Sequence, residues 1–196
     1  MALAVVLAFC ATPLLASTGD EQQTIEALRI LIAHDPTNPE LPQLHEALGH
    51  FLLGIKVEVD EETAKEAEYH LHRAVELDPS LYWGWYDLAI LHMDTEEGNQ
   101  YLKNAIAANP QFPEPYYWLA YTYSRNYRDA EAILIFEQYL QVIHSYPDAA
   151  GRMELAEKLL AELRTGGKGK ELRKVRRPEG PEAHSLSNSF SDNQDN

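Results

Sequence analysis

The residues of this sequence that could do chemistry are histidines and carboxylates, and their spacing decides what they can do. His45, Glu46 and His50 lie close together, a combination that resembles a helical zinc site. Such a site needs histidines four residues apart, because that spacing places both rings on one helix face. His45 and His50 are five residues apart and diverge around the helix. We therefore predict no metal site here.

No other group of residues predicts a reaction. The glycine-rich segment at 166–169 lies in a polar tail, whereas a phosphate-binding loop follows a strand. No nucleophile can be assigned together with a base and a group that orients this base. The sequence predicts that the protein is not an enzyme, and that it has no catalytic residues, no metal and no cofactor.

An apolar stretch opens the chain. Residues 1–17, MALAVVLAFCATPLLAS, carry no charged side chain and contain Cys10, the single cysteine. The stretch is short for a membrane span, and small residues end it, which is typical of a secretory signal. We predict a signal peptide at 1–19 and export to the periplasm, the cell envelope or the extracellular space. An uncleaved N-terminal membrane anchor is the alternative.

The distribution of charge restricts the partners. The net charge is −15 at pH 7, and basic residues become frequent only after residue 165. Because an acidic surface repels phosphate backbones, we expect no nucleic-acid partner. Residues 165–196 are first basic and then polar, a composition typical of a disordered tail. Membrane contact is expected only through this basic tail or an uncleaved N-terminus.

The elements that position any binding residue are helices. Apolar residues recur at helical spacing from Thr24 to Arg164, and Pro-containing segments at 35–42, 78–80, 109–115 and 146–148 mark helix ends. Turns at such intervals are typical of a helical repeat protein. The predicted helices span 21–34, 41–54, 61–77, 81–93, 96–108, 114–125, 128–144 and 149–164.

The helix pairs repeat one residue pattern: Leu48-Gly49, Leu88-Ala89 and Leu119-Ala120 on the first helices, Ala67, Ala74, Ala105 and Ala132 on the second helices, and the terminal Pro79 and Pro110. This pattern resembles the tetratricopeptide repeat, a two-helix unit of about 34 residues. The resemblance implies an all-α solenoid over 20–164, with about three helix pairs, a leading half repeat and a C-terminal capping helix. It also places Gly49 where paired helices approach closely, and Trp85, Leu88, Tyr116, Leu119 and Tyr123 in the core.

The resemblance further implies a binding groove, because the first helices of successive tetratricopeptide repeats line one concave face. The matching positions are Gln43, Glu46, His50 and Leu53 in the first pair, Trp83, Tyr86, Ile90 and Met93 in the second, and Tyr117, Tyr121, Ser124 and Arg125 in the third. Exposed Trp, Tyr and Met are typical of a binding hot spot. We expect Trp83, Tyr86, Tyr117 and Tyr121 to form one open surface, unless the helix at 149–164 covers part of it.

These features together predict a scaffold or adaptor that binds a peptide segment of a partner protein. The aromatic groove and the acidic surface favour an apolar, aromatic or basic segment. The alternative is a structural protein that assembles with copies of itself into a homo-oligomer.

Overall fold

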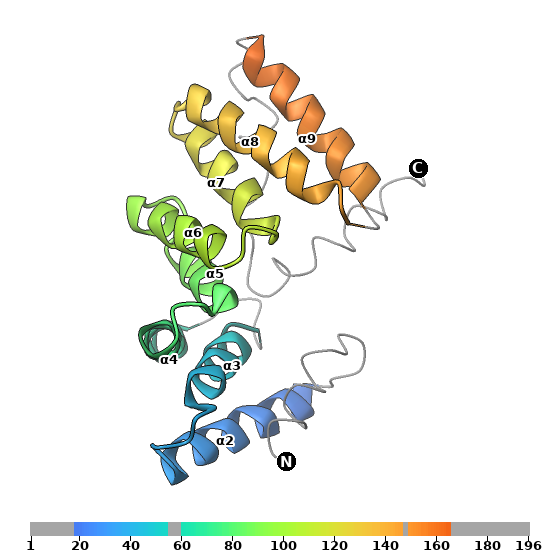
Figure 1. The fold of residues 1–196 in the computed structure, drawn as a ribbon. Helices are drawn as coiled ribbons and strands as arrows, with labels where there is room; N and C mark the ends of the chain where they lie inside the picture. Colours follow the sequence, from blue (N-terminus) through green and yellow to red (C-terminus); the bar gives the residue numbers. More distant parts are fainter. Residues whose placement is uncertain (1–17, 55–59, 147–148, 166–196) are drawn as a thin grey trace. The chain divides into compact units, whose positions relative to one another are not determined.

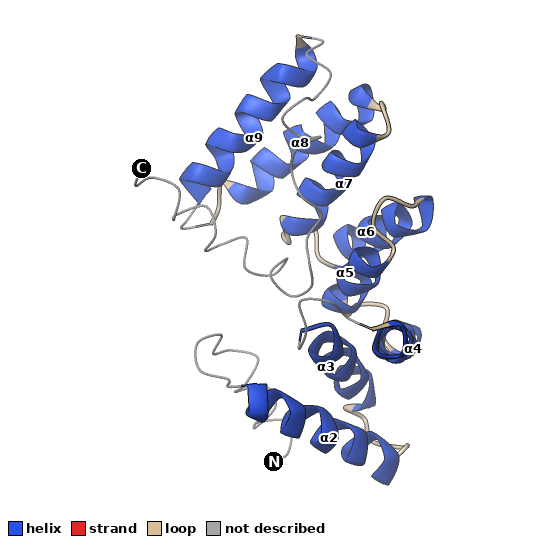
Figure 2. Ribbon diagram, turned by 180° about the vertical axis from the view of Figure 1, so that it is seen from behind, coloured by secondary structure: helices blue, strands red, loops and turns tan. Residues whose placement is uncertain are grey.

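A computed structural model describes residues 18–54, 60–146 and 149–165, and every element within these ranges is a helix (Figures 1 and 2). The helices are α2 (Thr18–His34), α3 (Leu41–Gly54), α4 (Glu61–Leu77), α5 (Tyr82–Leu91), α6 (Glu96–Ala108), α7 (Glu114–Arg125), α8 (Asp129–Ile143) and α9 (Ala149–Arg164). The all-α prediction is confirmed. The predicted signal peptide falls almost wholly, and the predicted tail beyond Thr165 entirely, outside the described residues.

The predicted boundaries agree with these helices to within three residues at each end. The larger differences concern the start of α2, which is Thr18 rather than residue 21, and the end of α5, which is Leu91 rather than residue 93. The end of α5 has a local cause: Asp94 has a φ of 68° and reverses the chain, and the Thr95 hydroxyl donates to the His92 carbonyl at 2.7 Å. No described helix is long and apolar enough to cross a membrane.

One turn recurs after α2, α4 and α6 and shows the repeat directly. Its first residue is Asp35, Asp78 or Asn109, followed each time by proline. The side-chain oxygen of each accepts a hydrogen bond from the backbone N–H two residues later, at 3.0, 3.0 and 3.1 Å. Its backbone carbonyl accepts another from the N–H three residues later, at 3.2, 3.2 and 3.1 Å. The same side-chain hydrogen bond therefore ends three helices, and each of these turns leads into the next helix pair.

The chain divides into two compact units, Met1–Gly84 and Trp85–Asn196, and the division falls within α5. In unit 1, α3 packs on both α2 and α4. A Cβ added at Gly49 would lie 2.5 Å from Leu71 Cγ and 3.1 Å from the Ala67 carbonyl oxygen. The predicted close approach at Gly49 is confirmed. Arg29 ties α2 to α4 by two hydrogen bonds to the Glu66 carboxylate, at 2.8 and 2.7 Å.

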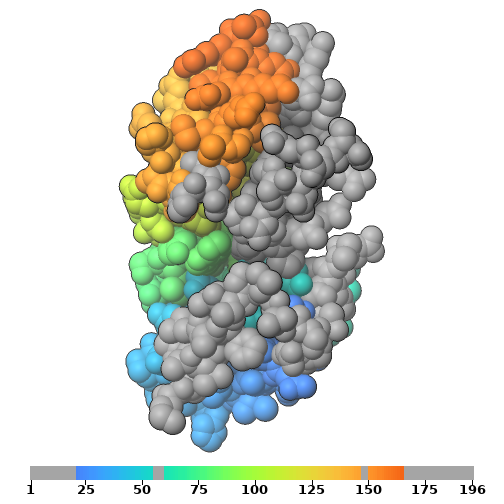
Figure 3. Space-filling model, turned by 90° about the vertical axis from the view of Figure 1, so that its right-hand side faces the viewer, coloured from blue at the N-terminus to red at the C-terminus, as the bar shows by residue number. Residues whose placement is uncertain are grey.

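In unit 2, α7 packs between α6 and α8, and α9 packs on α8. Figure 3 shows α9, in orange, at the surface of this unit. Leu88, Tyr116, Leu119 and Tyr123 are buried, as predicted for packing positions. Trp85 is the exception: it is only half-buried and stacks on Tyr101 with ring centroids 6.0 Å apart.

Candidate functional site

The predicted groove residues divide between the two units. Gln43, Glu46, His50 and Trp83 belong to unit 1, and Tyr86, Ile90, Met93, Tyr117, Tyr121, Ser124 and Arg125 belong to unit 2. The continuity of a groove across both units stays a prediction.

Unit 1 brings its four candidates to a partly open surface, which we call the α3 face (Gln43, Glu46, His50 and Trp83). All four side chains are half-buried, whereas Leu53, which was also predicted for the groove, is buried. The edge of the His50 ring meets the Trp83 ring with centroids 6.4 Å apart, and Trp83 also lies 5.7 Å from the Tyr82 ring. An α3 histidine and a tryptophan at the start of α5 thus form one aromatic surface.

A carboxylate fixes the start of α5 against α3. The backbone N–H of Gly84 donates a 2.8 Å hydrogen bond to Glu46 Oε1, which satisfies one of the amides that a helix N-terminus leaves without an intrahelical partner. A Cβ added at Gly84 would lie 2.9 Å from Val75 Cγ1, so glycine also permits the close approach to α4. These contacts hold Trp83 beside His50.

Five unit 2 candidates are not on an open surface, so the prediction of their exposure was wrong. Tyr86, Tyr121 and Ser124 are 0% exposed, Met93 is 3% exposed and Tyr117 is 6% exposed. For Tyr117, Tyr121 and Ser124 the cause is the position of α7, in which every residue from Pro115 to Ser124 is buried. Because helices pack against two of its sides, α7 has no long open face.

The aromatic rings of unit 2 pack on one another. Tyr86 meets Phe112 edge to face at 5.3 Å, and Tyr121 meets Trp118 edge to face at 5.3 Å. Tyr117 lies between Phe136 at 6.0 Å and Tyr139 at 5.7 Å, both on α8. Burial raises the pKa of the Tyr86 and Tyr117 hydroxyls above the ordinary tyrosine value, so both stay neutral.

Ile90 and Arg125 remain accessible in unit 2, Ile90 half-buried and Arg125 exposed. Arg125 Nη1 lies 3.1 Å from Asp94 Oδ2 and 3.2 Å from the Tyr121 hydroxyl, and its guanidinium lies 5.7 Å from the Tyr121 ring centroid. The charge of this predicted groove cation is thus balanced by Asp94, and the side chain covers one edge of Tyr121.

Sequence reasoning missed Arg152 on α9, which is only 9% exposed. Its Nη2 lies 3.2 Å from Glu114 Oε1 at the start of α7, and its Nε lies 3.4 Å from the Tyr139 hydroxyl. Its register could have revealed it: the other buried α9 residues, Ala156, Leu159, Leu160 and Leu163, follow Arg152 at helical spacing. These contacts reach Glu114 and Tyr139, neither of which is a predicted groove residue, so cover of the groove by the helix at 149–164 stays a prediction.

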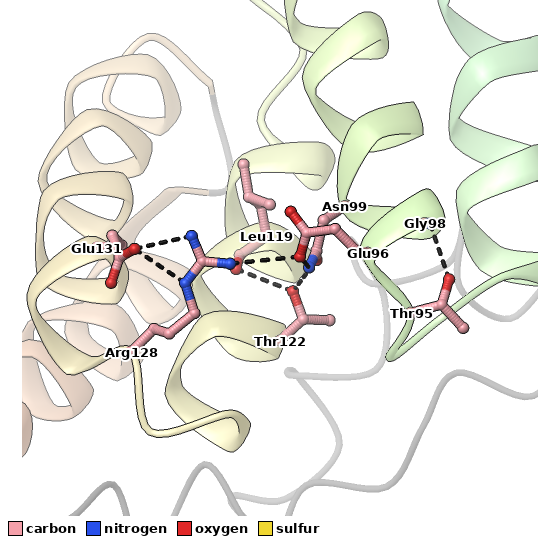
Figure 4. Close-up of polar contacts among 8 residues, drawn as sticks. All are labelled: Thr95, Glu96, Gly98, Asn99, Leu119, Thr122, Arg128 and Glu131. Carbon is pink, nitrogen blue, oxygen red and sulfur yellow. Dashed lines mark hydrogen bonds and ion pairs between the residues drawn. The ribbon is translucent and has the colours of Figure 1, made fainter.

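A polar network connects α6, α7 and α8 (Figure 4). The buried Thr122 hydroxyl donates to Asn99 Oδ1 at 2.6 Å, and Asn99 Nδ2 donates to Glu96 at 3.2 Å. Arg128 forms an ion pair with each of two glutamates. Its Nη1 lies 3.3 Å from Glu96 Oε2, and its Nη2 lies 2.8 Å from Glu131 Oε1. Glu96 lies on α6 and Glu131 lies on α8. Because the network joins these helices through Arg128, it stabilises the packing of unit 2.

The histidines that the structure describes do not gather into a metal site. The His45 ring contacts His70 on α4, whereas His50 faces Trp83, which confirms that these two α3 histidines diverge. Among the residues described, no group of three or more His, Cys, Asp or Glu side chains could hold a metal ion.

Comparison with known proteins identifies the repeat. Residues 101–134 match the family model described as tetratricopeptide repeat. A crystal structure of MamA superposes with a TM-score of 0.54 at 22% identity, covering 80% of this chain and 90% of that one. A second MamA crystal structure gives a TM-score of 0.53 at 21% identity, covering 86% and 87%. These structures share the fold. No significantly similar sequence was found among curated proteins.

Proposed function

We propose that this chain, whose residues 101–134 match the tetratricopeptide repeat, is a protein–protein interaction scaffold that binds a segment of a partner protein at the α3 face. The observation that carries this proposal is the His50–Trp83 contact, which forms an aromatic surface that is half-buried rather than sealed. Tryptophan is enriched among the residues that contribute most of the binding energy of an interface.

The charge of the protein favours a particular class of segment. Glu46 lies on the α3 face, and the net charge of the chain is −15. The negative electrostatic field attracts a basic segment, tolerates a neutral one and repels an acidic one. We therefore infer that the bound segment carries an apolar or aromatic anchor for Trp83, flanked by neutral or basic residues.

The test is affinity capture from the source cells with the full chain as bait. Trp83→Ala should weaken binding of the captured protein by about 30-fold or more, the effect of losing an interface anchor worth about 2 kcal/mol. The matched control is Tyr127→Ala, which removes an aromatic that is 75% exposed in unit 2. Equal binding by the wild type and Trp83→Ala, with both folded, would reject the α3 face as the binding surface.

Self-assembly is the second candidate function. The side chains of Tyr127 and Leu134 in unit 2 are 75% and 55% exposed, and exposed apolar side chains can pair between copies. Light scattering over a concentration series separates the two functions. Self-assembly would be supported if the molar mass of the wild type rises with concentration, whereas that of Leu134→Glu stays at the value of the monomer.

Export is also proposed, on the apolar character of residues 1–17. Mass spectrometry of the native protein should find a chain that begins near Asp20. An intact chain from Met1 in the cytosol would contradict export.

A further inference from the structure

A buried histidine on α3 and a half-buried histidine on α4 meet nitrogen to nitrogen. His45 Nδ1 lies 2.7 Å from His70 Nδ1, and the ring centroids are 4.9 Å apart. His45 is 6% exposed and His70 is half-buried. No role in the proposed function requires this contact, which lies within unit 1.

The chemistry of this contact allows one hydrogen between the two atoms. A neutral imidazole carries a proton on one ring nitrogen and a lone pair on the other. At 2.7 Å, one Nδ1 donates its proton and the facing Nδ1 accepts it. If both rings were imidazolium, two N–H groups and two positive charges would face each other, and the contact could not persist.

We propose that the His45–His70 contact is an acid-operated latch, which holds α3 against α4 near neutral pH and opens when both rings become protonated.

The groups around the latch also disfavour a doubly charged pair. Arg73 on α4 and Arg29 on α2 act against protonation of His45 and His70 respectively. Glu66 on α4 acts in the opposite direction on His70, but both of its oxygens are held by Arg29. Tyr69, beside His70 on α4, contributes a ring edge at 5.1 Å.

Burial sets the direction of the pH response. Mainly through burial, and further through the facing ring, the pKa of His45 falls from 6.5 to about 4, and burial also lowers the pKa of His70. The folded chain therefore binds fewer protons than the unfolded chain between about pH 6.5 and pH 4. The latch stabilises the fold fully above about pH 6.5, and this contribution decreases as the pH falls through that window.

The position of the latch would connect it to binding. His45 precedes Glu46 on α3, so an α3 that separates from α4 would displace Glu46 from Gly84 and His50 from Trp83. Acid release of a bound segment rests on the proposed function. The latch itself does not, and measurements on the free protein test the latch alone.

The experiment compares the full wild-type chain with His45→Gln/His70→Gln, in which two amides can share a hydrogen bond but neither can be protonated. Chemical unfolding is measured at pH 7 and at pH 5. The folding equilibrium constant of the wild type should fall by about 20-fold more than that of the double variant, from the His45 pKa alone. His72→Gln, on the same helix, is the matched control and should behave as the wild type does.

A second measurement needs no variant. Nitrogen-15 NMR of the wild-type histidine rings should show one Nδ1–H tautomer in the pair and lowered pKa values for both rings. Ordinary pKa values for both, or equal losses of stability in the wild type and the double variant, would overturn the latch. So would stabilisation by Zn²⁺ that disappears in the double variant, because the two nitrogens would then share a metal rather than a proton.

Discussion

At the scale of single residues, two helical glycines differ sharply in the space around them. A Cβ added at Gly98 would overlap the carbonyl of His92, which is backbone and cannot move aside, whereas Gly151 has nothing within 4 Å. Gly98→Ala should therefore destabilise the fold by about 1–3 kcal/mol. Gly151→Ala should stabilise it by about 0.4–1 kcal/mol, because alanine lowers the conformational entropy of the unfolded chain. Chemical unfolding of both variants checks the contrast, and a stable Gly98→Ala protein would contradict this packing.

Gly49 offers a test of the α3–α4 approach. A leucine there would have to displace Leu71, whose Cγ is 2.5 Å from the position of the added Cβ. Gly49→Leu should cost about 1–3 kcal/mol through overpacking. Thermal unfolding measures this cost, and a melting temperature equal to that of the wild type would show that α3 and α4 do not approach at this point.

Some residue roles could be predicted from the sequence and others could not. The close approach at Gly49 follows from a small residue in the repeat pattern, and the structure places Gly49 against Leu71. The burial of Tyr117 and Tyr121 does not follow from that pattern, because it depends on which helices cover α7. Spacing identifies one packing face of a helix, but it does not reveal how much of the opposite face is covered.

At the scale of elements, an ion pair docks α9. Arg152 and Glu114 have side chains that are 9% and 15% exposed, so removing Arg152 leaves a carboxylate that is largely desolvated. Arg152→Ala should cost about 3–5 kcal/mol. The double variant Arg152→Met/Glu114→Gln should recover most of this loss, because no uncompensated charge remains.

The control for Arg152 lies on the same helix. Arg164 pairs with Glu137 at 2.6 Å, but these side chains are 55% and 42% exposed. Arg164→Ala should change stability by only about 0–1 kcal/mol, because water screens the pair. If urea unfolding gives similar losses for Arg152→Ala and Arg164→Ala, burial does not strengthen the α9 contact.

The ends of the helices were the most predictable features, because hydrogen bonds of nearby side chains fix them. The Asp-Pro and Asn-Pro pairs at Asp35, Asp78 and Asn109 end three helices through the same side-chain contact. The end of α5 was harder to predict, because Asp94 adopts a positive φ that an aspartate only occasionally takes.

At the scale of the whole molecule, we expect the stability to come from the helices and not from the C-terminal residues. Deletion from Gly166 onward should change the melting temperature by less than about 2 °C, because this polar composition contributes little core. Deletion from Ala149 onward, which also removes α9 and the buried Leu159, should lower it clearly. Differential scanning calorimetry compares the two deletions, and equal effects would contradict a structural role for α9.

The central proposal is that a partner protein binds the α3 face. Hydrogen exchange of the full chain, measured free and with its captured partner, tests this claim most directly. Binding should slow exchange in Leu41–Gly54 and at 82–84, and leave Glu114–Arg125 unchanged, because α7 is already buried. Unchanged exchange in α3, with slowed exchange elsewhere in the chain, would contradict it.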